Sequence, residues 1–307
     1  RGSVIFTSST CHNDEITDID WCNRDLYLSS ASLDGTIVLH TLKGVNRGSK
    51  AECKIERRMV LSPSMTFNRC LLAFCPTLGS IGEQSAKLSP FLISAHGCSL
   101  TMWKTSNGCS VGQLGGKTYH SAHITAMTIE QSNGRLYSGD EQGRIIIWKL
   151  RSQKREIPLA GGGDYEVLHH VDIDGFREVR SLSLSTTTSH KQLLVTTNGR
   201  EDNLYVYDFS SQTITTFCLE TKMSKIGFSN AIFSPDGSIV IGGTTDGRMF
   251  FMDSSGISKK VRDKLSHDCF RPEVGYNIIT HMRFWFVFTT FTINKNKERN
   301  AQNTNQV

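Results

Sequence analysis

The chain has 307 residues, of which 38% are hydrophobic and 21% are charged. These values are typical of a soluble globular protein with a large core. The net charge of +5 arises entirely in residues 257–307, because residues 1–256 contain equal numbers of basic and acidic side chains. The charge therefore argues against nucleic-acid binding by the first 256 residues.

Cysteine usage indicates a reducing compartment. The nine cysteines are scattered, include no C-x-x-C pair and are odd in number, which argues against a disulfide framework and a zinc site. No N-x-[ST] glycosylation sequence and no signal peptide is visible. We therefore expect an intracellular, cytoplasmic protein. Residues 282–293 are apolar and aromatic, but a run of this length that contains Arg283 is too short to span a bilayer.

An internal repeat dominates the chain. Residues 120–149 contain three apolar runs separated by polar turns, and a shift of 108 residues places residues 12–41 on them without a gap. Residues 228–251 repeat the pattern again. Short strands with a regular period are typical of β-propeller blades, so we expect an all-β fold.

In chain order, residues 1–11 are expected to form the outer strand of a preceding blade, and residues 1–256 to form the propeller. We expect five legible four-stranded blades of a seven-bladed ring, near residues 12–58, 59–116, 117–160, 176–218 and 224–256. Residues 257–307 are expected to be a diverged blade remnant and a basic, partly disordered tail.

Three connecting segments have expected roles within this scheme. Residues 43–58 are interpreted as a basic linker and residues 151–177 as a longer loop region. The second blade is degraded and contains the polar insertion 79–89. Its expected strands lie around Met65 and Phe67, then at 71–74, 91–94 and 99–103.

The repeats resemble WD-repeat blades, in which a buried His, Ser or Thr, Asp and Trp hydrogen-bond in series. Burial of such polar groups requires partners, because each unpaired group costs ~1–3 kcal/mol. The first copy supplies His12, Ser30 and Asp34, with His40 in place of the Trp. The third copy supplies His120, Ser138 and Trp148, with Gln142 in place of the Asp. On this alignment no blade has the full set.

Two short motifs suggest ligand sites. Residues 112–118 (GQLGGKT) nearly match a phosphate-binding loop, but the first glycine is replaced by Val111 and a strand rather than a helix is expected to follow. His169, His170, Asp172 and Asp174 resemble a metal cluster. Adjacent side chains on an extended segment point to opposite faces, and a calcium loop's closing Glu is absent. We expect a glycine-rich turn and an exposed polar loop respectively, with no metal and no cofactor.

His120 and Asp34 also invite a catalytic interpretation. The same His and Ser spacing occurs in two copies, which favours a structural role, and no nucleophile elbow or HExxH motif is present. We therefore expect no catalytic residue. The basic residues of the tail are expected to be solvated. The paired-arginine motif of phosphoinositide-binding propellers is absent, and Phe176-Arg177-Glu178 is its nearest approach.

The order of the copies is similar to one family, the Jouberin proteins of the ciliary base. The similar passages are residues 12–35, with an H-x-x-x-I-x-D-[LI]-x-W entry, residues 59–74 and residues 120–148. The resemblance implies a non-enzymatic scaffold at the basal body and transition zone that binds other proteins through one rim. It also implies a coiled coil and a C-terminal barrel domain, neither of which is visible in this sequence. The alternatives are an adaptor of a nuclear or ubiquitin-ligase complex and a propeller enzyme with an unrecognised site.

Overall fold

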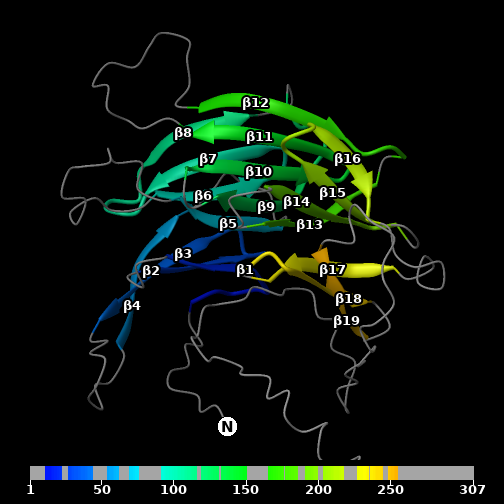
Figure 1. Ribbon diagram of the computed structural model, residues 1–307. Coiled ribbons are helices and arrows are strands. Elements are labelled where there is room, and N and C mark those ends of the chain that lie inside the picture. Colours follow the sequence, from blue (N-terminus) through cyan, green and yellow to red (C-terminus); the bar gives the residue numbers. More distant parts are fainter. Residues whose placement is uncertain are drawn as a thin grey trace, which may run out of the picture.

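In the computed structural model, the described residues form five antiparallel sheets (Figure 1). For residues 42–43 and 54–59 only the backbone is described. The described residues are 11–22, 27–43, 54–61, 69–75, 91–115, 119–130, 133–150, 165–175, 177–185, 191–199, 203–217, 227–234, 236–244 and 248–254.

Each sheet is a meander in which neighbouring strands in the sequence pair with one another. The first sheet contains β1 (Ile16–Trp21), β2 (Tyr27–Ser32), β3 (Ile37–Lys43) and β4 (Lys54–Leu61). The second contains β5 (Cys70–Cys75), β6 (Phe91–His96), β7 (Ser99–Lys104) and β8 (Ser110–Gly115). The third contains β9 (Ile124–Glu130), β10 (Arg135–Asp140), β11 (Arg144–Leu150) and β12 (Tyr165–Asp172).

The last two sheets follow the same plan. The fourth contains β13 (Val179–Leu184), β14 (Gln192–Thr197), β15 (Leu204–Asp208) and β16 (Thr213–Thr216). The fifth contains three described strands, β17 (Phe228–Phe233), β18 (Ile239–Thr244) and β19 (Met249–Asp253). The predicted all-β class with blade-like sheets is confirmed. The number of blades in a complete ring stays a prediction, and residues 1–10 and 255–307 lie outside the described residues.

Two expected segments were placed wrongly. The supposed linker 43–58 overlaps β4, which completes the first sheet and ends at Leu61, beyond the expected boundary. The supposed loop 151–177 contains β12, so the third sheet extends past residue 160. Both are edge strands of their sheets. The sequence of β4 has little alternation of apolar residues and therefore gave a weak signal.

In the second sheet, the four expected strands were shifted by one strand toward the N-terminus. Its first strand is β5, not the run around Met65 and Phe67, which lies outside the described residues. Its fourth strand is β8, which was expected to be part of a turn. Half of the β8 side chains are exposed, and two of its residues are glycine, so composition alone favoured a loop.

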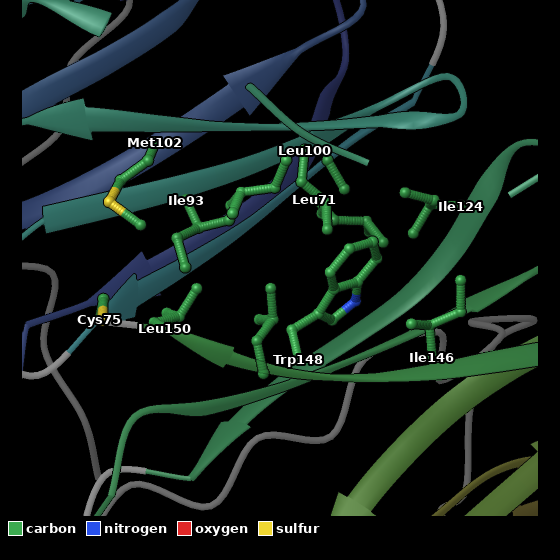
Figure 2. Close-up of a cluster of buried hydrophobic side chains, with 12 residues drawn as sticks. Leu71, Cys75, Ile93, Leu100, Met102, Ile124, Ile146, Trp148 and Leu150 are labelled. Atoms are coloured by element: carbon green, nitrogen blue, oxygen red, sulfur yellow. The ribbon is translucent and has the colours of Figure 1, made fainter. Parts of the chain in front are cut away.

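The sheets pack face to face in chain order, with the inner strands β1, β5, β9, β13 and β17 beside their successors. Four buried apolar clusters lie at the four successive interfaces between sheets. Figure 2 shows the one between the second and third sheets, where the Trp148 indole lies among Leu71, Leu100 and Ile146. Middle-strand residues alternate between the two neighbours, because successive side chains of a strand point to opposite faces. Thus Leu92 packs toward the first sheet and Ile93 toward the third.

Side chains of the inner strands also bond to the backbone of the next inner strand. Thr17 donates to the carbonyl of Cys70 at 2.9 Å, and Thr125 donates to the carbonyl of Val179 at 2.5 Å. The Asp18 and Asp20 carboxylates accept from the N–H groups of Leu72 and Phe74, at 2.8 and 2.6 Å. The open backbone edge of one inner strand is therefore satisfied by side chains of its predecessor.

The packing predicts a clear ranking of cysteine reactivity. Burial raises the pKa of Cys75 to about 12; burial, and then the Asp18 carboxylate, raises the pKa of Cys70 to about 12, whereas Cys109 is exposed. At pH 8 we expect iodoacetamide to modify Cys109 on the order of 100-fold faster than Cys70 or Cys75, because the thiolate is the reactive species. Peptide mass spectrometry after timed labelling measures the ratio. Comparable rates in the native protein would show that the second sheet is not packed against its two neighbours as described.

Candidate functional site

The third sheet holds a buried chain of four polar side chains. The His120 ring lies 2.9 Å from the Asp140 carboxylate through Nδ1 and 2.7 Å from the Ser138 hydroxyl through Nε2. The Trp148 indole N–H donates to the same hydroxyl at 2.8 Å. Because the indole can only donate and the carboxylate accepts, every group is paired if His120 carries its proton on Nδ1 and Ser138 donates to Nε2.

This network corrects the expectation that no blade has the full set. The carboxylate comes from Asp140, the last residue of β10, and not from position 142. The sequence alignment with Asp34 pointed to Gln142, which instead accepts from the Ser121 hydroxyl in the neighbouring turn. The Asp140 Oδ1 atom also accepts from the N–H groups of Gln142 and Arg144, both at 2.9 Å. One carboxylate therefore fixes both the histidine and the turn that follows β10.

In the first sheet, the histidine is also paired at both ring nitrogens, but a threonine hydroxyl lies between it and the aspartate. His12 contacts the Ser30 hydroxyl at 2.7 Å, as predicted, but its second nitrogen lies 3.0 Å from the Thr36 hydroxyl and 3.4 Å from Asp34. Thr36 in turn donates to Asp34 at 2.6 Å. Burial alone would raise the pKa of Asp34, but hydrogen bonds from the Thr36 hydroxyl and the Asn13 and Thr36 N–H groups lower it to about 2. His40 is buried opposite Leu28, where the third sheet has Trp148 opposite Leu136.

The remaining sheets retain less of the network. In the second sheet the Trp103 indole donates to the Ser94 hydroxyl at 2.8 Å, a pair that the sequence alignment did not identify. In the fourth sheet Tyr207 takes the Trp position opposite Leu193, and Val195 stands where the hydroxyl would be. The fifth sheet has Met252 at the Trp position, as expected.

The networks lie beneath one set of connecting turns, which we call the histidine rim. Backbone hydrogen bonds join turns of different strands and sheets there: Ile124 N–H to Gly97 C=O at 2.8 Å, and Ile173 N–H to Gly143 C=O at 3.0 Å. The described residues of the rim are 12–16, 32–36, 96–98, 119–123, 140–144, 172–175, 177–178 and 197–199.

Among the exposed side chains of the rim, those that carry a negative charge outnumber those that can carry a positive one. Glu141 lies 3.6 Å from the partly exposed His123 ring, and Asp172 forms a two-point ion pair with Arg144 at 2.8 and 3.1 Å. The hydrogen bond from Arg144 lowers the pKa of Asp172. Three further carboxylates are exposed at the ends of the turns: Asp14, Glu15 and Asp174. Such a surface complements a basic partner.

Neither short motif forms a ligand site among the described residues. Gly112 and Gly115 belong to the edge strand β8, and residues 116–118 lie outside the described part. His169 and His170 are in β12, not in a loop, and the His169 ring stacks on Tyr207 with centroids 6.1 Å apart. Within the described ranges, no group of three or more His, Cys, Asp or Glu side chains is placed to hold a metal ion.

Two buried contacts between sheets were missed by sequence reasoning. The Asn203 amide donates to the carbonyls of Thr197 and Phe228, at 2.8 and 2.7 Å, and accepts from the Phe228 N–H at 3.0 Å. Glu130 accepts from the Lys191 ammonium at 2.6 Å and from the Tyr137 hydroxyl at 3.2 Å. The contacts join residues of consecutive sheets that are 25 and 61 positions apart in the sequence, so no local pattern could have identified them.

Residues 3–41 match the family model described as WD domain, G-beta repeat. The described part of this match covers β1, β2 and most of β3, with His12, Ser30 and Asp34. A comparison with curated proteins found no match. In the described segments no helix is long and apolar enough to cross a membrane.

Proposed function

Because the chain is a WD40-repeat protein with blade-like sheets, we propose that it is a non-enzymatic scaffold that binds other proteins through the histidine rim. WD40 repeats commonly act as interaction modules. The observation that carries the choice of surface is the His120–Asp140 network, which fixes the turn after β10 through two backbone N–H groups. A loop held rigidly by its scaffold loses little entropy on association, which favours binding.

The charge of the rim suggests the chemistry of the partner. Asp14, Glu15 and Asp174 are exposed carboxylates, whereas the neighbouring Arg144 is already paired with Asp172. We infer that the partner presents a basic segment, because complementary charge speeds encounter and selects the correct partner. Residues 257–307 of a second copy of this chain are also basic, so the test uses peptides of defined sequence.

The test measures the affinity of the full chain for a panel of basic, neutral and acidic peptides by fluorescence anisotropy. We expect basic peptides to bind, and the Asp14→Lys/Glu15→Lys variant to bind them about tenfold more weakly at low salt, with a smaller difference at high salt. Glu166→Lys is the matched control, because Glu166 is an exposed carboxylate on the outer strand β12 and not on the rim. An equal loss in the control, or equal binding of acidic peptides, would contradict the proposal.

The finer proposal is a Jouberin-type role at the ciliary base. Its support is the order of the repeat motifs, from the entry at His12 to the Asp-Gly turn of the fifth copy. The expected result is that the tagged protein concentrates at basal bodies in ciliated cells. Accumulation in the nucleus, or stable association with a ubiquitin ligase, would favour the adaptor alternative instead.

A further inference from the structure

Each of the first four sheets buries one face against the sheet that follows it, and we call this its outgoing face. The residue before the Trp position of the third strand marks that face in every sheet. It is Leu39, Met102, Ile147 and Val206 in the first four sheets, and none of these is more than 4% exposed. In the fifth sheet it is Phe251, which is 54% exposed. The fifth sheet therefore exposes, on its outgoing face, an apolar position that the first four sheets bury against the next sheet.

A buried polar atom on the same face points to the kind of neighbour. The Asp18 carboxylate on β1 accepts from the Leu72 N–H at 2.8 Å, and the Ser181 hydroxyl on β13 accepts from the Ala231 N–H at 3.5 Å. Hairpin register places Asn230 of β17 at the equivalent position. Asn230 is 8% exposed, and its Oδ1 atom is buried without a hydrogen-bond partner. This oxygen lies where the backbone N–H of a further inner strand would donate.

The residue before Asn230 carries the second half of the contact. Thr17 and Thr125 occupy the position of Ser229 in their own strands, and both donate to a carbonyl of the next inner strand. Both also lie 3.4 Å from a carbonyl of their own sheet. Ser229 has only the equivalent bond within its own sheet, to Gly243 C=O at 3.0 Å, among the contacts described. A carbonyl on a further strand would complete the same pair.

The sequence contains a segment that fits this face. Residues 279–284 (ITHMRF), which lie outside the described residues, have the pattern of β9 (ITAMTI at 124–129) and of β1 (ITDIDW). The spacing agrees as well. Near the end of each inner strand, one residue occupies the same position in the register of its sheet: Trp21, Phe74, Ile129, Leu184 and Phe233. Consecutive members of this series are 53, 55, 55 and 49 residues apart, and Phe284 lies 51 residues after the last of them.

We propose that residues 279–284 dock on the outgoing face of the fifth sheet as the inner strand of a sixth blade. The Met282 N–H donates to Asn230 Oδ1, and the Ser229 hydroxyl donates to the carbonyl of Ile279. The Met282 and Phe284 side chains cover the apolar face marked by Phe251, as Leu72 and Phe74 cover that of the first sheet. A shift of 108 residues does not reveal this segment, because Phe284 lies 100 residues after Leu184, the equivalent position two sheets earlier.

The test is hydrogen exchange of the full chain, followed by fragmentation to single amides around Met282. We expect that amide to exchange at least about tenfold more slowly than an unstructured peptide, since it is bonded and covered. In the Asn230→Ala and Phe251→Asp variants, the Met282 amide should exchange about tenfold faster than in the unmodified chain. Asn230→Asp should keep it, because Asp18 makes the same bond in the first sheet. Leu168→Asp, which places the same charge on an exposed apolar position of β12, is the matched control and should leave it unchanged.

Amides of β10 report whether each variant is folded, so loss of the whole fold is separable from loss of docking. Exchange of residues 279–284 at the unstructured rate in the unmodified chain would overturn the proposal. Protection that disappears on dilution would also overturn it, since the face would then be covered by a second copy of the chain. Protection that neither Asn230→Ala nor Phe251→Asp reduces would place the segment elsewhere.

Discussion

Replacing Asp140 with alanine is expected to destabilise the fold by about 3 kcal/mol, since the carboxylate serves three donors at once. It accepts from His120 Nδ1 and from the N–H groups of Gln142 and Arg144, and the residue is fully buried. Each buried donor left unpaired costs ~1–3 kcal/mol, and removal of one member of a buried polar pair is costly for the same reason. Urea unfolding followed by circular dichroism measures the change.

The control for this prediction is Gln142→Ala. Gln142 is exposed, and its side chain accepts one bond from the Ser121 hydroxyl, so its loss should cost less than about 0.5 kcal/mol. The repeat alignment places Gln142, not Asp140, at the carboxylate position. A larger effect at Gln142 than at Asp140 would therefore restore the alignment and refute the network.

Gly139→Ala is expected to destabilise the interface between the third and fourth sheets by about 1–3 kcal/mol, as overpacked cores do. A Cβ at this position would lie 2.5 Å from Val179 Cγ1 and 2.8 Å from Val179 Cβ, and Val179 is fully buried. The first sheet carries Ala31 at the equivalent position, where the facing residue of the next strand is Cys70. The close approach of Val179 on the neighbouring sheet, and not strand propensity, therefore explains why residue 139 is a glycine.

A double-mutant cycle with Val179→Ala tests the cause of that loss. The single Val179→Ala change should cost about 1.5–2 kcal/mol through lost burial, but the double variant should be more stable than the sum of the two losses by about 1 kcal/mol. Gly112→Ala is the matched control, because nothing lies within 4 Å of its added Cβ on the exposed strand β8. Strict additivity between 139 and 179 would show that the two residues do not meet.

The local features of the sheets could be predicted from the sequence. The 108-residue period, the apolar alternation and the Ser30 and Ser138 positions predicted hairpins and the His–Ser pairs, which the structure confirms. These features depend on residues close together in the chain or at equivalent places in a hairpin. The outer strands β4, β8 and β12 were missed or misplaced. Each lies at the edge of its sheet, and the sequences of β4 and β8 have little alternation of apolar residues.

By itself the sequence determined the blade-like unit and its repetition, because a strand's period and a tight turn are local properties. Only the tertiary structure decided which carboxylate binds His120, since Asp140 and Gln142 are two residues apart and the bend at the end of β10 selects between them. It also decided the contacts between sheets, such as those of Asn203 with Phe228 and of Glu130 with Lys191. These join residues that are 25 and 61 positions apart in the sequence, and no local pattern specifies such a partner.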